Sequence, residues 1–299
     1  MFQLLKLPTT SWTDSMKKFM LITNAYKDTN LTLSHKIVSY IQQKGGEAGI
    51  CISSMEGETE NDFSCSEIPE DTECIFVLGG DGTLIRAATK VERLHIPLIG
   101  VNLGTLGYLC ELEETTVTEA VDRLMENQYI IEERLMLSGC QVGKQEAHFA
   151  LNDVVLHWTG GLSMLKLMVY VNGEYLSTYE ADGILVATPT GSTGYNMSAG
   201  GPIVDPKARM LLLTPINAHD INSPSIVLGA EDVIEIEVGS RRLRKDEVVG
   251  VSFDGDQVIQ LKVGDRLRVE QAGHTIPICK LRNQSFLEIL RKKMQRRGL

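Results

Sequence analysis

The sequence predicts an α/β domain followed by a β-rich domain in a chain of 299 residues. Up to about residue 128, apolar runs typical of strands alternate with segments in which apolar residues recur at helical spacing. From residue 129 onward the spacing becomes two, as in strands with one buried face. A chain of this length has room for two domains of ordinary size.

The first domain is expected to begin at Met16, because residues 1–15 show no periodicity and predict a flexible extension. Strands are predicted over residues 19–23, 49–53, 74–78 and 96–101, and helices over residues 33–41, after residue 80 and over residues 117–125. The acidic, polar segment 55–72 predicts a surface loop. Strands that alternate with helices imply parallel pairing, and ligands of such sheets bind at the carboxyl ends of the strands.

In the second half, strands are predicted over residues 151–156, 165–171, 184–187, 233–238, 249–253 and 267–269, with one short helix after Gly191. The pair Asn172-Gly173 predicts a hairpin. A last helix over residues 285–296 carries one apolar stripe, so we expect it to return to the first domain. The predicted domains are therefore a Rossmann-like α/β domain of residues 16–128 and 283–299, and a β-rich, sandwich-type domain of residues 129–282.

Composition excludes several classes of protein. The net charge of −10 disfavours nucleic-acid binding, which depends on basic side chains that neutralise phosphates. The sequence contains no apolar run long enough to cross a membrane, and its start does not have the pattern of a secretory signal. None of the six cysteines forms a Cys-x-x-Cys pair, so we expect reduced thiols and a cytoplasmic location.

A glycine-rich turn over residues 79–83 is the sharpest local feature, because a buried strand enters it and a helix leaves it. Glycines allow close approach of a ligand, and free N–H groups at a helix start favour an anion. Asp81 is unusual in a phosphate turn, and it is a candidate general base or metal partner; the alternative is that it only caps the helix. Arg86 is the nearest cation, unless it serves a salt bridge on the helix surface.

Two further segments carry polar groups that suit a nucleotide. Residues 188–202 are dense in hydroxyls and glycines and include Tyr195, whose ring can stack on a base; the alternative is a tight turn without a ligand. Asn152 and Asp153, at a predicted strand start, can bind a base or ribose hydroxyls, or can be a strand-edge pair. Asp182, before Gly183, is a similar candidate.

In this order and at these distances, the segments 79–83, 152–153 and 188–201 resemble the NAD kinase family. The resemblance extends to residues 102–109 and 253–256, and it covers the chain from about Lys17 to its end. The glycine turn is shared with lipid kinases of the diacylglycerol type, whereas the long hydroxyl-rich segment is much more specific to NAD kinases.

The resemblance implies phosphoryl transfer from ATP, or from inorganic polyphosphate, to the 2′-hydroxyl of the adenosine ribose of NAD, which gives NADP. It implies that Asp81 is the general base. The remaining candidates for substrate and nucleotide binding lie in the glycine-rich stretches of the first domain, around the adenosine half, and at three further acidic positions. These are Gly80, Gly82, Thr83, Arg86 and Tyr108; Asn152, Asp153, Thr190, Thr193, Gly194, Tyr195 and Ser198; and Glu180, Asp182 and Asp256.

The resemblance also implies Mg²⁺ or another divalent cation, held largely by the donor phosphates, and a homodimer or homotetramer. Gly194 stands where the family most often has Ala, and it should only loosen the turn. Glu180 replaces an Arg of some members, and this replacement leaves the preference between NAD and NADH open. One alternative is a lipid kinase, which needs an apolar channel. The other is a non-catalytic dinucleotide-binding regulator, which the presence of Asp81 argues against.

Overall fold

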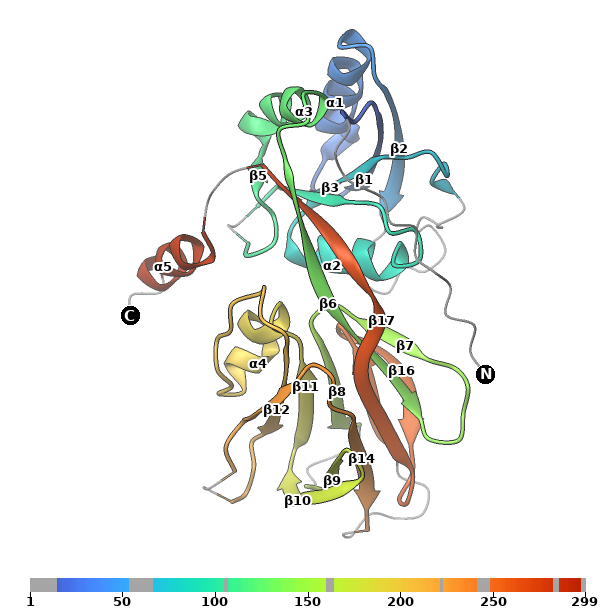
Figure 1. The fold of residues 1–299 in the computed structure, drawn as a ribbon, viewed down its shortest axis with the longest axis vertical. Helices are drawn as coiled ribbons and strands as arrows, with labels where there is room; N and C mark the ends of the chain where they lie inside the picture. The colour runs from blue at the N-terminus through green and yellow to red at the C-terminus, as the bar shows by residue number, and fades with distance from the viewer. Residues whose placement is uncertain are drawn as a thin grey trace. The chain divides into compact units, whose positions relative to one another are not determined.

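The computed structural model describes residues 15–53, 67–104, 107–159, 164–220, 223–240, 248–281 and 285–296. Its strands are β1 (Lys18–Asn24), β2 (Glu47–Ser53), β3 (Cys74–Gly79), β4 (Leu98–Asn102), β5 (Leu112–Glu113), β6 (Ile130–Gln141), β7 (His148–Ala150), β8 (Asp153–Trp158), β9 (Leu165–Val171), β10 (Glu174–Ala181), β11 (Gly183–Ala187), β12 (Met210–Ile216), β13 (Ile226–Gly229), β14 (Ile234–Gly239), β15 (Val249–Phe253), β16 (Asp256–Leu261) and β17 (Arg266–Lys280) (Figure 1). Its helices are α1 (Thr32–Gln43), α2 (Asp81–Lys90), α3 (Val117–Met125), α4 (Tyr195–Ser198) and α5 (Phe286–Arg296), with 3-10 turns η1 (Thr29–Leu31), η3 (Glu114–Thr116) and η4 (Gly191–Thr193).

The chain divides into two compact units. The described residues of 1–80, 96–131 and 278–283 belong to the first, and those of 81–95, 132–277 and 284–299 to the second. The helix α2 therefore falls in the second unit, whereas the sequence suggested a domain of residues 16–128. A hydrogen bond within the second unit contributes to this, because Thr89 Oγ1 donates to Asp254 Oδ2 at 3.3 Å. The return of residues 283–299 to the first domain stays a prediction.

The first unit is built on a parallel sheet in the order β2-β1-β3-β4. Phe19 and Phe76 of the sheet share one core with Ile37 of α1 and Val121 of α3, so both helices cover the same face. Figure 1 shows α1 and α3 next to each other, and Tyr40 Oη donates to Asp122 at 2.8 Å. The predicted alternation of strands and helices is thus confirmed, and the carboxyl ends of β1, β3 and β4 lie at one edge of the sheet.

The second unit is a sandwich of two antiparallel layers. One is a six-stranded sheet in the order β13-β12-β11-β8-β15-β16, and the other contains β10-β9-β14-β17 with β6 and β7. Leu156 and Val186 of the first layer share a core with Leu167 and Ile236 of the second. Because side chains alternate along a strand, neighbours such as Leu185 point to the opposite face, where Ala199 and Val204 pack against them. The chain after residue 188 therefore covers the outer face of the six-stranded sheet.

Several strands after residue 129 were not predicted from the sequence. These are β6, β7, β10, β12, β13 and β16. The strand predicted over residues 267–269 is longer, because β17 pairs with β14 near its start and with β4 near its end. The predicted hairpin is confirmed, since Asn172 and Gly173 both have positive φ values, +53° and +83°.

Residues 1–14 and 54–66 lie outside the described part of the chain, and with them all but the last residue of the predicted extension and most of the predicted loop. Met16 is buried, and its N–H donates to the carbonyl oxygen of Leu124 at 3.2 Å. Among the described helices, none is long and apolar enough to cross a membrane.

Candidate functional site

The glycine turn places Asp81 in the first turn of α2. All six residues of β3 are buried, and Gly80 joins this strand to the helix that begins at Asp81. Asp81 is half-buried, Thr83 is buried, and Gly82 is exposed. A Cβ atom on Gly82 would have no other atom within 4 Å, so the space beside the first turn is open. The N–H groups at a helix start favour an anion in such a space.

Asp254 connects α2 to the segment that carries Asn152 and Asp153. Its Oδ1 accepts the N–H groups of Asn152 and Asp153 at 2.7 and 3.1 Å, and its Oδ2 accepts the N–H of Leu151 at 2.7 Å and the hydroxyl of Thr89. Asp256, which the resemblance implies as a ligand-contacting residue, is exposed at the start of β16, and its role stays a prediction. The pair Asp254-Gly255 is typical of a turn, and such a pair does not show which backbone groups the carboxylate will hold.

The hydroxyl-rich segment 188–198 folds directly over Asn152. The N–H of Thr188 donates to the carbonyl oxygen of Asn152 at 2.8 Å, and the Thr188 hydroxyl donates to the carbonyl oxygen of Leu151 at 2.6 Å. The same hydroxyl accepts the N–H of Gly191 at 3.0 Å. A Cβ atom on Gly191 would lie 2.1 Å from the backbone carbonyl oxygen of Asn152, so only glycine fits at this close approach.

Three predicted residues, Asn152, Asp153 and Gly194, come together here. A Cβ atom on Gly194 would lie 3.6 Å from Asn152 Nδ2 and 4.0 Å from Asp153 Oδ2. Asn152 Oδ1 is buried without a hydrogen-bond partner among the residues the structure describes. Burial, with a smaller contribution from the neighbouring charge of Asp254, raises the pKa of Asp153 to about 7. The cluster therefore offers one unused acceptor and one carboxyl group that can keep a proton near neutral pH.

Tyr195 begins α4 and is 45% exposed, so its ring is accessible to a ligand. Its position depends on the buried neighbour Asn196, whose Oδ1 accepts the hydroxyl of Thr214 at 2.7 Å and whose Nδ2 donates to the carbonyl oxygen of Pro202 at 2.9 Å. Ser192 makes a similar anchor, exchanging hydrogen bonds with both backbone groups of Val204. The sequence did not single out Ser192 or Asn196, because buried and exposed polar residues alternate within this segment.

The other hydroxyl candidates of this segment differ in burial. Thr190 is buried, Thr193 is half-buried and Ser198 is exposed. The Thr193 hydroxyl donates to the carbonyl oxygen of Thr190 at 3.4 Å. Of the three, Ser198 is thus the most accessible to a ligand.

Glu180 and Asp182 lie away from the Asn152 cluster within one chain. In the register of β11, Ala187 pairs with Asp153, whereas Gly183 pairs with His157 at the other end. Four residue steps along a strand, from Gly183 to Ala187, span about 13 Å, which is the distance between the two ends. Asp182 is exposed and accepts the side-chain amide of Asn217 at 3.0 Å.

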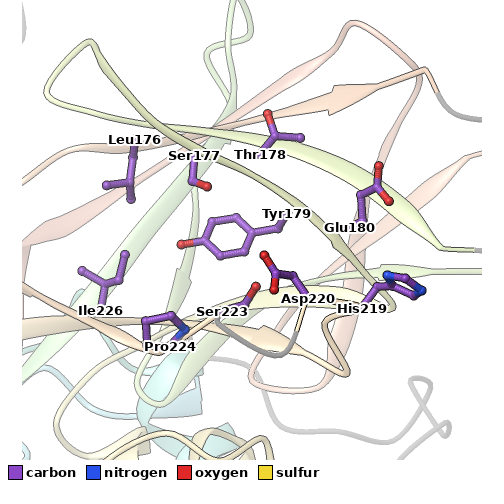
Figure 2. A pocket seen from close by; sticks show the side chains of 10 residues that line it. All are labelled: Leu176, Ser177, Thr178, Tyr179, Glu180, His219, Asp220, Ser223, Pro224 and Ile226. Carbon is purple, nitrogen blue, oxygen red and sulfur yellow. The ribbon is translucent and has the colours of Figure 1, made fainter.

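Glu180 lines a separate cavity of about 510 Å³ in the second unit. Figure 2 shows the ring of Tyr179 between the polar side chains of Glu180 and Asp220 and the apolar side chains of Leu176 and Ile226. Of the remaining predicted residues, Arg86 is half-buried on α2, and Tyr108 is half-buried in the first unit.

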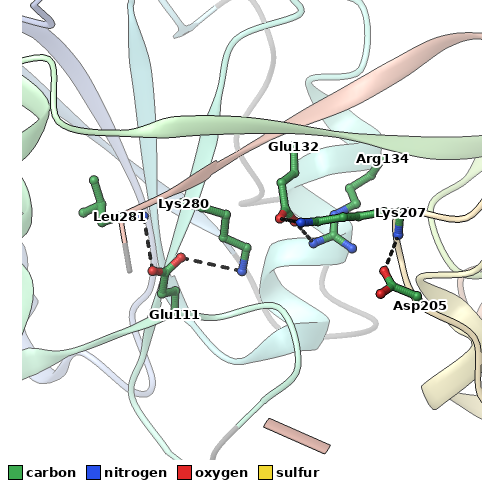
Figure 3. A network of polar contacts seen from close by, with 7 residues as sticks. All are labelled: Glu111, Glu132, Arg134, Asp205, Lys207, Lys280 and Leu281. Atoms are coloured by element: carbon green, nitrogen blue, oxygen red, sulfur yellow. Dashed lines mark hydrogen bonds and ion pairs between the residues drawn. The ribbon is translucent and has the colours of Figure 1, made fainter. Parts of the chain in front are cut away.

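Ion pairs fasten the chain that follows α4. Glu132 of β6 pairs with the buried Arg134 at 2.5 Å and with Lys207 at 3.1 Å, and the N–H of Lys207 donates to Asp205 at 2.9 Å (Figure 3). Burial lowers the pKa of Arg134, and the charge of Glu132 opposes this effect. Because Val204 lies in the same stretch, these contacts help to hold the hydroxyl-rich segment on its sheet.

A second group of polar contacts, around Glu111, lies within the first unit. Glu111 forms an ion pair with Lys280 at 3.6 Å and accepts the N–H of Leu281 at 3.1 Å, also drawn in Figure 3. These contacts fix the end of β17 beside β4.

Comparisons with known proteins agree along most of the chain. A family model described as the ATP-NAD kinase N-terminal domain matches residues 19–129, and one described as the ATP-NAD kinase C-terminal domain matches residues 151–281. An NAD kinase of Agathobacter rectalis is 60% identical over 279 residues, which cover 93% of this chain and 99% of that protein. An NAD kinase of Lachnospira eligens is 40% identical over 294 residues, which cover 93% of this chain and all of that protein.

Two solved structures share the fold at 22% identity each. Yeast NADH kinase complexed with NADH superposes with a TM-score of 0.79, over 95% of this chain and 89% of that chain. An NAD kinase from Archaeoglobus fulgidus in complex with ATP superposes with a TM-score of 0.74, over 93% of this chain and 98% of that chain.

Proposed function

The chain belongs to the ATP-NAD kinase family and phosphorylates NAD to NADP, and we propose a division of this reaction among its residues. The observation that carries the proposal is the meeting of Asn152, Asp153 and Gly194, on a segment that Asp254 ties to α2. Neither a lipid kinase nor a non-catalytic regulator is favoured by the comparisons.

Asp81 acts as the general base. The 2′-hydroxyl oxygen of the adenosine ribose forms a bond to the terminal phosphorus of ATP, and the bond from that phosphorus to the departing ADP breaks. The hydroxyl proton goes to the carboxylate of Asp81. Open space beside Gly82, the buried Thr83 and the N–H groups of the helix start support a phosphate at this turn, with Gly80 before it and Arg86 one turn later. A positioned base contributes about 10²–10⁴-fold to such a step.

The adenosine half of NAD binds to the cluster around Asn152. The buried, unused Oδ1 of Asn152 suits the amino group of adenine, since a buried acceptor without a partner is costly. Asp153 binds a hydroxyl of the ribose. The exposed ring of Tyr195 stacks on the base, and the hydroxyls of Thr190, Thr193 and Ser198 complete the pocket, with Gly194 beside Asn152 and Asp153.

A divalent cation such as Mg²⁺ fits this site. Within the described residues no cluster of three or more metal-ligating side chains exists, and Asp81 supplies a single carboxylate at the turn. Mg²⁺ keeps several of its waters and binds readily to substrate phosphates, so the donor phosphates would hold most of its coordination, and the carboxylate of Asp81 stays available as the base. When bound, the ion neutralises charge on the transferring phosphoryl group.

The nicotinamide side is completed by a second copy of the chain, so the active enzyme is a homodimer or homotetramer. Glu180 and Asp182 lie at the opposite end of β11 from Asp153, which supports their action from a neighbouring subunit. Asp256 and Tyr108 contribute polar contacts to the nucleotide. Inorganic polyphosphate is the second candidate donor. The five cysteines in the described residues are free, which supports a reducing, cytoplasmic location.

The test is a coupled assay. Purified protein is incubated with NAD, ATP and Mg²⁺, and NADP is detected with an NADP-specific dehydrogenase. Parallel reactions with polyphosphate or NADH in place of ATP or NAD identify the preferred donor and acceptor. We expect NADP with ATP; failure to form it with either donor would contradict the function.

A further inference from the structure

A lysine far from the glycine turn in sequence lies directly beside it. Lys27 follows β1, and its Nζ lies 3.3 Å from the position that a Cβ atom would take on Gly80. The absence of a side chain on Gly80 is therefore what lets the ammonium group approach the turn. Lys27 is exposed, and among the described residues no acidic side chain forms an ion pair with it.

The loop that carries Lys27 is fixed at both ends. The carbonyl oxygen of Asn24 accepts the N–H groups of Lys27 and Asp28, both at 2.9 Å. Asp28 is buried, and its carboxylate accepts the N–H groups of Leu33 and Ser34 at 2.9 and 3.0 Å. Because the carboxylate of Asp28 is occupied in this way, the charge of Lys27 remains available to an anion from outside the protein.

Lys27 and Gly80 lie at the edge of the sheet where its parallel strands have their carboxyl ends, and ligands of such sheets bind at this edge. Thr23 of β1 pairs with Leu78 of β3, and Gly79 of β3 pairs with Asn102 of β4, so the loops after these strands start at the same edge. A phosphate chain at this edge meets the ammonium group of Lys27 and the glycine backbone of residues 79–80 within one unit of the fold.

We propose that Lys27 binds phosphate oxygens of the nucleoside triphosphate donor. Both ATP and NAD carry phosphates, but the residues assigned to the adenosine half of NAD lie in the second unit, whereas Lys27 and Gly80 lie in the first. The inference rests on the proposed function. Lys27 adds a positive charge that the glycine turn itself lacks, and it therefore contributes to the affinity for the donor.

The experiment compares Lys27→Met with Lys36→Met, which removes another exposed lysine, from α1. Binding of a non-hydrolysable ATP analogue with Mg²⁺ is measured by calorimetry, and KM values for ATP and NAD are measured separately. We expect Lys27→Met to weaken analogue binding and to raise the KM for ATP about tenfold, the effect of losing one charge-assisted hydrogen bond. Lys27→Arg should recover part of the loss, and Lys36→Met should have no effect.

Three other outcomes would overturn the proposal, and each has a different meaning. An unchanged affinity for the analogue, with normal thermal unfolding of Lys27→Met, excludes a contact to the donor. A rise in the KM for NAD alone assigns the charge to the acceptor. If wild-type protein neither binds the analogue nor forms NADP from ATP, ATP as the donor fails together with the role of Lys27.

Discussion

Near neutral pH, the folded chain is expected to keep a proton on Asp153 that the unfolded chain has lost. Asp153 is buried, and burial together with the charge of Asp254 raises its pKa from 3.8 to about 7. Between these values the folded state binds more protons than the unfolded state, so the free energy of unfolding falls as pH rises and levels off above about pH 7. Burial also raises the pKa of Asp254, so its titration likewise lowers the free energy of unfolding as pH rises.

The size of the effect follows from the shift. About three pKa units correspond to about 4 kcal/mol in total. Since the unfolded carboxyl group is already ionised at pH 5, roughly 2.5 kcal/mol of this is lost between pH 5 and pH 8.

Urea denaturation at several pH values, without nucleotides, measures this loss. Asp153→Asn should remove most of the slope, because an amide does not titrate, whereas Asp256→Asn, which changes an exposed carboxylate at the start of β16, should retain it. Equal slopes for wild type and Asp153→Asn would refute the reasoning.

The remaining predictions concern catalysis and folding. Asp81→Asn should lower turnover at least ~10²-fold with a smaller change in NAD affinity, and near-normal turnover would exclude the base role. Tyr195→Ala should weaken NAD binding by roughly 1–3 kcal/mol in calorimetry, and Tyr195→Phe much less, unless the hydroxyl and not the ring makes the contact. Gly82→Ala should melt no lower than wild type, since nothing in the fold occupies that space, yet NADP formation should fall at least about tenfold if phosphate binds there. A chain that starts at Met16 should fold and form NADP. Deletion through Thr23 removes most of the buried strand β1 and should give insoluble protein. A melting temperature far below that of the full chain for the Met16 form would show that residues before Met16 pack on the fold.

Periodicity in the sequence was sufficient to predict the strands and helices whose apolar residues follow one clear pattern. The apolar runs of β1 and β3, the helical spacing of α1 and α3, and the turn at Asn172 are local signals, because burial and turn conformation act on residues close in the chain. The order and spacing of the glycine and hydroxyl motifs likewise indicate the family from the sequence alone.

Contacts between distant residues were decided only by the tertiary structure. Asp254 holds the amides of residues 151–153 because the register between β15 and β8 brings the turn after β15 to the start of β8, and no local pattern in the sequence indicated this contact. Lys27 reaches Gly80 because β1 and β3 are neighbours in the sheet. Local patterns report burial and turn conformation, whereas strand order and register determine which polar side chains meet.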